Sequence, residues 1–179
     1  EEKTTWHMDW MFRRGLDGLF LTGSYGAGPM MTVDERIRVY ELAADVMKKH
    51  PGKTMLPHVG ALRTADAVTL AQAAQELGAA AVGAVPPFYY KFTDSDVKEY
   101  YRAIIDAVSI PVFAYNNPAT SRFTFSVGLV HQLIDLGLAG LKDSPLSVGF
   151  LSRIAYETKQ AGTPFQIILG TSTGWLPFY

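Results

Sequence analysis

A lysine stands where a buried strand is expected to end. Lys142 lies in the apolar run 137–144, which reads GLAGLKDS. Burying an unpaired ammonium costs several kcal/mol, on the order of the net stability of a whole domain, so such a lysine normally loses its proton. A neutral lysine in a dry pocket is a nucleophile that forms a Schiff base with a ketone or aldehyde. Taken alone, a lysine whose side chain reaches back to water is an equally good interpretation.

Polar and aromatic side chains follow the other expected strands. Parallel α/β folds bind their ligands at the carboxyl ends of strands, so these ends are where a site is sought. Glycines, hydroxyls and phenols gather there, in the segments 23–28, 58–60, 86–90, 115–118, 142–144 and 170–172. These residue types suit chemistry on an oxygen-rich carbonyl compound that carries a carboxylate. They suit the binding of a large cofactor less well.

Tyr115 ends the strand expected beside that of Lys142. There a phenol can move a proton during imine formation and carbon–carbon cleavage, although packing alone would also explain an aromatic residue. Tyr89 and Tyr90 follow two prolines and fit packing or interface roles equally well. His58 is expected to be a hydrogen-bonded core residue rather than a base. The four histidines show no metal-ligand spacing, which disfavours a metal-dependent aldolase.

A glycine-rich loop spans 23–28 and leads into a helix that begins near Thr32. Backbone amides in such a loop can hold a small anion. Its Gly-x-x-Gly-x-Gly order is neither a dinucleotide fingerprint nor a Walker loop, so a nucleotide site is weakly supported. A tight turn between strand and helix would also explain the glycines.

The composition excludes several classes of protein. The chain has 179 residues, 48% hydrophobic and 18% charged, as in ordinary globular domains. Its net charge of −1 creates no field that would attract nucleic acid or anionic lipid. The absence of cysteine excludes disulfides, thiolate zinc sites and a cysteine nucleophile. The acidic start lacks the apolar region of a signal peptide and no apolar stretch approaches 18 residues, so we expect no membrane partner and a cytoplasmic location.

Short apolar runs alternate with longer amphipathic ones, which indicates repeated βα units and a parallel sheet. The expected strands are 17–24, 54–60, 80–87, 111–116, 138–142 and 166–170, and the expected helices are 32–50, 64–77, 94–108, 125–135 and 146–161. Helix N-caps are expected at Thr32, Thr64 and Thr93, and at Ser144 or Ser147. With no linker in the chain, we predict one domain over 1–179. The pattern fits a barrel or a doubly wound open sheet.

Taken together, five segments resemble the lysine-dependent, class I pyruvate aldolases, the family that includes dihydrodipicolinate synthase and N-acetylneuraminate lyase. These segments are 15–24, 58–60, 87–90, 114–118 and 140–144, in the family's order and spacing. The resemblance implies an α/β fold of the TIM (β/α)8 barrel type. Lys142 would form the Schiff base with pyruvate or a 2-oxo acid, and Tyr115 would be the general acid/base. Ser24 and the amide of Tyr25 would hold the pyruvate carboxylate.

Further roles follow from the same resemblance. Tyr89 would complete a proton relay across a subunit interface, which requires an oligomer, expected to be a homotetramer built from close dimers. Ser144 would face the acceptor end of the substrate, and Gly170 and Thr171 stand at the next strand end as further substrate-binding positions. The partners implied are small 2-oxo acid and aldehyde substrates. No cofactor and no metal are expected.

The chain also departs from the family's pattern. Tyr25 and Ala27 stand where the family usually has threonine and glutamate. Thr120 occupies the place of the arginine that assists dicarboxylic substrates in dihydrodipicolinate synthases, which argues against that activity. The segment 87–92 is closer to sialic-acid lyases, and 26–29 is similar to 2-keto-3-deoxygluconate aldolases.

Length is the largest departure. Family members have one more strand before Trp6, and an eighth strand and a helical tail after Tyr179. We therefore expect a truncated barrel with open edges at strands 17–24 and 166–170. The predicted function is a pyruvate-dependent aldolase or lyase acting on a 2-keto-3-deoxy or sialic-type acid. The alternatives are a dihydrodipicolinate synthase, a 2-oxo-acid dehydratase of the same family, a non-catalytic barrel and a nucleotide-binding α/β module.

Overall fold

The computed structural model describes residues 1–170 of the chain. Six strands alternate with helices along this part. The strands are β1 (Gly18–Leu21), β2 (Thr54–Pro57), β3 (Val82–Ala84), β4 (Val112–Asn116), β5 (Gly140–Asp143) and β6 (Gln166–Leu169). The helices are α1 (Glu2–Arg13), the short 3-10 helix η1 (Gly28–Met30), α2 (Val33–Met47), α3 (Thr64–Glu76), α4 (Asp94–Ala107), α5 (Pro118–Ser121), α6 (Val127–Asp135) and α7 (Val148–Gln160). The predicted βα alternation is confirmed.

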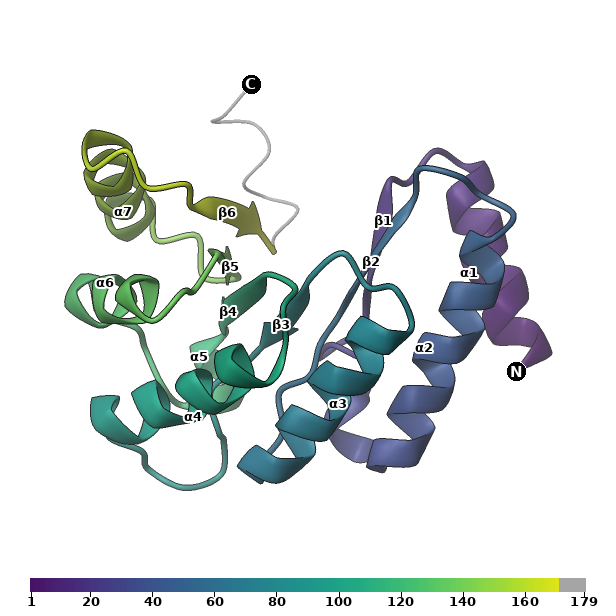
Figure 1. The fold of residues 1–179 in the computed structure, drawn as a ribbon, viewed down its shortest axis with the longest axis horizontal. Helices are drawn as coiled ribbons and strands as arrows, with labels where there is room; N and C mark the ends of the chain where they lie inside the picture. The colour runs from purple at the N-terminus through teal and green to yellow at the C-terminus, as the bar shows by residue number, and fades with distance from the viewer. Residues whose placement is uncertain (171–179) are drawn as a thin grey trace.

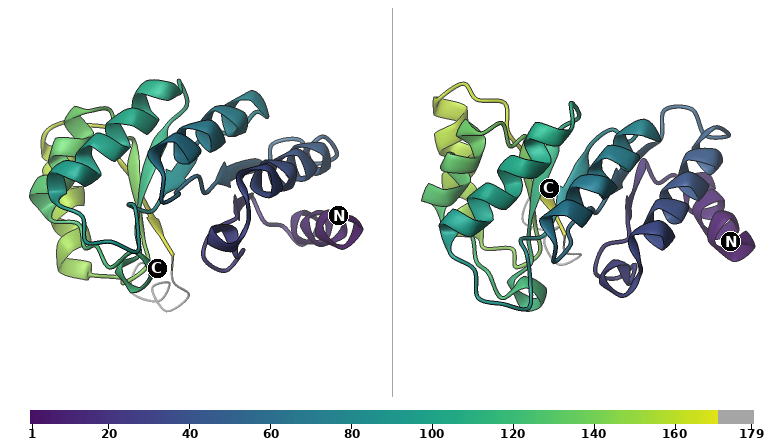
Figure 2. Two further views of the ribbon diagram at one scale, coloured as in Figure 1. Left: turned by 90° about the horizontal axis from the view of Figure 1, so that it is seen from below. Right: turned by 60° about the horizontal axis from the view of Figure 1, so that its bottom comes forward.

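The strand order decides between a barrel and an open doubly wound sheet. Every paired strand is parallel to its neighbour in sequence, with β1 beside β2 and β3 to β6 in chain order. A bridge between His58 and Gly83 connects the two groups. A doubly wound sheet would reverse its order at a switch point, whereas a barrel keeps it. The described strands form an arc of a TIM (β/α)8 barrel, with the helices along its outer side (Figures 1 and 2).

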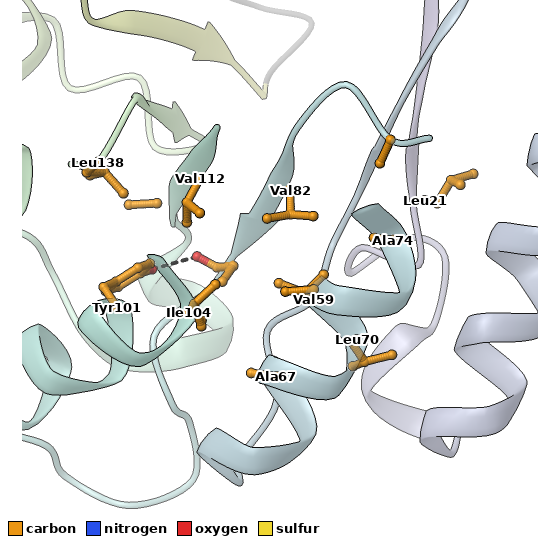
Figure 3. Packing of buried hydrophobic residues seen from close by; sticks show 14 of the residues in the cluster. Leu21, Val59, Ala67, Leu70, Ala74, Val82, Tyr101, Ile104, Val112 and Leu138 are labelled. Atoms are coloured by element: carbon orange, nitrogen blue, oxygen red, sulfur yellow. Dashed lines mark hydrogen bonds between the residues drawn. The ribbon is translucent and has the colours of Figure 1, made fainter. Parts of the chain in front are cut away.

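The core lies between this arc and the helices. Small residues on α3, Ala67 and Ala74, flank the fully buried Leu70, and these three residues belong to the same buried apolar cluster as Val59 and Val82 (Figure 3). Small side chains let a helix approach the sheet closely, and close packing is what makes apolar burial effective. The buried strands β3 and β4 show no exposed position, as expected for parallel strands covered on both faces.

The two outer strands leave open edges in the described part of the chain. Within residues 1–170, β1 pairs only with β2, and β6 pairs only with β5. A cavity of about 630 Å³ lies beside β1, lined in part by Leu19 and Leu21. Another, of about 740 Å³, opens at the amino ends of the strands and is lined by Met55, Phe113 and Ile168. None of the helices within residues 1–170 is both long enough and apolar enough to cross a membrane.

Several sequence-based boundaries are wrong. The strand expected over 17–24 ends at Leu21 because Thr22 has a φ of 50°, which turns the chain out of the ladder. The strand expected over 80–87 is confined to β3 and stops before Pro86, since proline cannot donate to a ladder. Helix α1 was not expected, although Met8 and Phe12 on one face of it are buried.

The expected helix caps are partly confirmed. Thr32 and Thr93 both form capping boxes, with Glu35 and Asp96 as the acidic partners. Thr64 is not an N-cap, because it is already the first helical residue and its predecessor supplies no side-chain cap. Ser147 occupies the N-cap position of α7 but its side chain makes no capping hydrogen bond, and Ser144 lies outside the helix.

Candidate active site

The amine of Lys142 lies against the ring of Tyr115. The two residues are direct partners in the register of β4 and β5, so their side chains project from the same face of the sheet. The Lys142 Nζ is 3.5 Å from the centroid of the Tyr115 ring and 4.9 Å from that of Phe20 on β1. Aromatic faces attract an ammonium, so these rings hold the amine at the carboxyl ends of the strands.

Three polar side chains surround the Tyr115 hydroxyl. Ser144, just after β5, donates from Oγ to Tyr115 Oη at 3.3 Å. Asn117, just after β4, donates from Nδ2 to the same oxygen at 3.2 Å. The same Nδ2 also donates to Ser24 Oγ at 3.2 Å, which ties the loop after β1 to the site. Residues far apart in sequence are therefore joined around one phenol.

These neighbours set the acidity of Tyr115. Burial raises the pKa of its phenol, because the anion is poorly solvated there. The Ser144 hydroxyl, the Lys142 ammonium and, to a smaller extent, Ser24 act the other way and outweigh burial, so the pKa of Tyr115 lies below its ordinary value. A tyrosine with a lowered pKa gives up and recovers a proton more readily near neutral pH, as a general acid/base must.

Gly170 borders the lysine directly. Its amide donates to the carbonyl oxygen of Asp143 at 2.7 Å, which fixes the end of β6 next to that of β5. A Cβ atom built on Gly170 would lie 2.6 Å from Lys142 Nζ and 2.8 Å from Ser144 Oγ. Only glycine leaves room here for the amine and the hydroxyl as they stand.

The loop after β1 is held in a tight conformation that exposes backbone amides. A Cβ on Gly28 would lie 1.8 Å from the carbonyl oxygen of Thr22, so the chain crosses itself too closely for any side chain. Ala27 has a φ of 53°, in the left-handed region. Among residues 1–170, the amides of Ser24 and Tyr25 donate to no other group. They are available to an anion that approaches the loop.

A buried carboxylate supports the site from behind. Asp143 has no exposed surface and accepts hydrogen bonds from Asn116 Nδ2 at 2.6 Å and from the amide of Leu146 at 2.8 Å. Asn116 and Asp143 are register partners, one residue beyond Tyr115 and Lys142. Successive side chains on a strand point to opposite faces, so this bond pins β4 to β5 on the face away from the amine.

His58 is a buried core residue, as the sequence predicted. It is 1% exposed, and its Nε2 accepts a hydrogen bond from the amide of Val85 at 3.2 Å. Its Nδ1 therefore carries the proton and donates to the carbonyl oxygen of Thr22 at 3.2 Å. Burial, followed by the nearby Arg36 guanidinium, lowers the pKa of His58 to about 3. The ring is neutral and fully engaged, so it is not available as a base.

Two important polar residues were given no role by the sequence. Asn117 is linked to the loop after β1 by a hydrogen bond to Ser24, 93 residues away, which no local pattern reveals. Arg36 is 3% exposed and donates to the carbonyl oxygens of His58 and Gly60. A signal for Arg36 did exist, because it stands four residues before the buried Tyr40 and so shares the apolar face of α2.

Other expected site residues lie apart from the lysine. Tyr25 is fully exposed, so its ring points away from the site. Tyr89 is 75% exposed in the loop after β3, has a φ of 81° and packs edge-on against Tyr90. Thr171 lies outside the described residues. Within residues 1–170 there is no cluster of three or more histidine and acidic side chains that could hold a metal ion.

Comparison with known proteins identifies the family. The dihydrodipicolinate synthetase family matches residues 1–173. The chain belongs to this family. Its relatives in the dihydrodipicolinate synthetase family include an N-acetylneuraminate lyase of Rhizobium meliloti strain 1021, 35% identical over 156 residues, which are 86% of this chain and 51% of that protein. The N-acetylneuraminate lyase of Salmonella paratyphi B is 39% identical over 134 residues, 73% of this chain and 44% of that protein.

Solved structures of the dihydrodipicolinate synthetase family agree with the fold. A crystal structure of a prophage protein of the dihydrodipicolinic acid synthase family from E. coli K12, in complex with pyruvate, aligns with a TM-score of 0.86. It is 27% identical and the match covers 95% of this chain and 57% of that one. The chain thus spans about half the length of the relatives it matches.

Proposed function

We propose that the protein containing this chain is a class I aldolase that cleaves a 2-oxo acid reversibly into pyruvate and an aldehyde. The observation that carries this proposal is the contact between the Lys142 amine and the Tyr115 ring, 3.5 Å apart, at the carboxyl ends of neighbouring strands. Membership of the dihydrodipicolinate synthetase family supports it.

The reaction begins at the amine. Unprotonated Lys142 attacks the C2 carbonyl of the 2-oxo acid and forms a carbinolamine. The Tyr115 phenol protonates the hydroxyl of that adduct, which leaves as water, so a protonated Schiff base and the Tyr115 phenolate remain. The iminium accepts the electron pair of the C3–C4 bond as that bond breaks. The Tyr115 phenolate takes the proton of the C4 hydroxyl, so C4 leaves as an aldehyde. Tyr115 then returns the proton to C3 of the enamine, and water releases pyruvate and the free amine.

The substrate's carboxylate would bind at the loop after β1. Ser24 Oγ and the amides of Ser24 and Tyr25 are available hydrogen-bond donors on this loop. The segment 23–28 contains no lysine, arginine or histidine. Hydrogen-bond donors that the backbone already holds in place can bind a carboxylate without the help of a metal ion. The exposed ring of Tyr25 lies outside this arrangement and contributes only its amide.

A sialic-type or 2-keto-3-deoxy sugar acid is the substrate class that we favour. The curated relatives that are 35% and 39% identical are named N-acetylneuraminate lyases. Thr120 is exposed in α5, where an arginine for a dicarboxylic substrate would be needed in a dihydrodipicolinate synthase. Ser144, which donates to Tyr115 Oη, would face the departing aldehyde.

A panel of substrates tests this proposal. Sialic acid and several 2-keto-3-deoxy acids are incubated with the full-length protein, and released pyruvate is measured with lactate dehydrogenase and NADH. We expect release from at least one of them, lost in Lys142→Ala and kept in Lys159→Ala, which removes a lysine at the end of α7. Equal release by Lys142→Ala and the parent would refute the proposal.

We also propose that the protein is a homotetramer made of close dimers. The rings of Tyr89 and Tyr90 pack edge-on against each other on the loop after β3 and are exposed, and Met30 in η1 after β1 is 88% exposed. Exposed aromatic groups of this kind are characteristic of interface cores. Light scattering should give the mass of four chains, and a monomeric mass with full activity would contradict this proposal.

A further inference from the structure

We propose that Asn117 is a positioning residue that holds the Tyr115 phenol and the Ser24 hydroxyl in one network through the two hydrogens of its side-chain nitrogen. The inference rests on the proposed aldolase function and adds a residue to its machinery. Nδ2 lies 3.2 Å from both Tyr115 Oη and Ser24 Oγ, and a carboxamide nitrogen has one hydrogen for each.

The backbone of Asn117 is firmly anchored. Its carbonyl oxygen accepts from the amides of Thr120 and Ser121, each at 3.0 Å, and from their hydroxyls at 3.1 and 3.0 Å. Pro118 follows and opens α5. The residue is only 9% exposed. A side chain on such a rigid turn keeps its direction without losing much further entropy, as preorganised sites require.

The network leaves the phenol proton free to move. Tyr115 Oη accepts from Asn117 and from Ser144, and within residues 1–170 the phenol donates to no other group. Both bonds favour the phenolate over the phenol, because each donor interacts more strongly with the anion. Ser24 Oγ likewise accepts from Asn117, so its own hydrogen remains available for a carboxylate.

Other groups near Tyr115 do not replace this function. Lys142 faces the ring from β5, and the His58 ring lies edge-on with its centroid 5.9 Å away. His58 is neutral above pH values near 3 and contributes no charge that changes in the working range. Asn117 is thus the neutral donor that connects the acid/base residue to the carboxylate loop.

The test isolates the titration of one tyrosine. The ultraviolet absorbance of tyrosinate is followed with pH in the full-length protein, and subtraction of the same titration in Tyr115→Phe leaves Tyr115 alone. Asn117→Leu has nearly the same volume but no donor, and we expect it to raise the midpoint by about one pH unit. Asn117→Asp keeps the shape and adds a negative charge, so its midpoint should be higher still.

The pH dependence of kcat/KM should shift in the same order, with kcat lowered more than KM is changed. Thr120→Val is the control, because it removes one hydrogen bond to the Asn117 carbonyl and no hydrogen bond to the Tyr115 or Ser24 hydroxyl. The titration midpoint of Tyr115 in this variant should match that of the parent. Midpoints in both Asn117 variants equal to that of the parent, with folding verified by circular dichroism, would overturn the proposal. The titration needs no turnover, so it decides the role of Asn117 even if the aldolase function fails.

Discussion

Lys142 and Tyr115 are register partners on β5 and β4, and the lysine amine lies over the tyrosine ring at 3.5 Å from its centroid. The strand ladder itself sets this contact, because residues directly opposite each other on parallel strands project to the same face. The proposed nucleophile and the proposed proton carrier are therefore both placed by paired strands, whereas the loop after β1 and Ser144 lie on the connections that follow strands.

Tyr115→Phe separates the two functions of this tyrosine. The ring that contacts the amine remains, while the hydroxyl that accepts from Ser144 is lost. We expect pyruvate still to form a Schiff base with Lys142, and turnover to fall by about 10²- to 10⁴-fold. Steady-state kinetics measures this, with Tyr156→Phe on the exposed face of α7 as the control. Turnover within a small factor of the parent would show that the phenol is not the proton carrier.

Gly170→Ala should displace the amine without unfolding the chain. The new Cβ would lie 2.6 Å from Lys142 Nζ, the flexible end of a side chain that can move away. A misplacement of about 1 Å is enough to slow the reaction by about 100-fold. Schiff-base formation is measured by stopped-flow or quenched trapping. Gly149→Ala, at a helical position with open space around it, is the matched control, and equal rates in the two variants would contradict this account.

Asp143→Ala should destabilise the protein. The buried Asn116 Nδ2 and the partly buried amide of Leu146 would lose their acceptor. Leaving a buried polar group unsatisfied costs about 1–3 kcal/mol, so the free energy of unfolding should fall by about 2–5 kcal/mol. Denaturant titration measures the change. A loss below about 0.5 kcal/mol would mean that the bond between β4 and β5 contributes little.

His58 should make the fold sensitive to acid. Its pKa is about 3 in the folded chain and 6.5 when unfolded, so below pH 6.5 the unfolded state binds a proton that the folded state does not. Stability is therefore full above pH 6.5 and is lost as the pH falls toward 3. Between pH 7 and 5 the loss from this residue should be about 2 kcal/mol.

Denaturant titrations at several pH values test this prediction. His58→Asn keeps a donor for the Thr22 carbonyl but cannot titrate, so its unfolding free energy should change less over the same interval. Carboxyl groups with a lowered pKa, such as Glu35 and Asp96, lose their contribution to the free energy of unfolding only at pH values below the interval from 7 to 5. Parallel pH dependences in the parent and His58→Asn would be evidence against a buried neutral histidine.

Local patterns were sufficient for the residues on strands. The apolar run around Lys142 and the strand ending at Tyr115 are visible in the sequence, and parallel pairing of neighbouring strands then brings the two together. The sequential strand order needed the structure, since alternating strands and helices are common to barrels and open sheets. The short resemblance segments favoured the barrel because they preserve the family's order.

Residues that act across long separations were beyond such reasoning. The hydrogen bond from Asn117 to Ser24 depends on the path of the loop after β1. In that loop Thr22 and Ala27 adopt positive φ angles, which residue propensities do not predict for threonine or alanine. Helix α1 was missed because its polar residues outweigh a narrow buried stripe of Met8 and Phe12. Tyr25 was expected to contribute its amide, and its ring is fully exposed.

Lys142 is the nucleophile of the proposed reaction, and trapping its Schiff base tests this role directly. The full-length protein is incubated with pyruvate and borohydride, digested and examined by mass spectrometry, with Lys142→Ala and Lys159→Ala treated in parallel. We predict one reduced pyruvate adduct on the peptide containing Lys142, dependent on pyruvate and unchanged in Lys159→Ala. An unmodified Lys142, or an adduct on another lysine that persists in Lys142→Ala, would show that Lys142 is not the nucleophile.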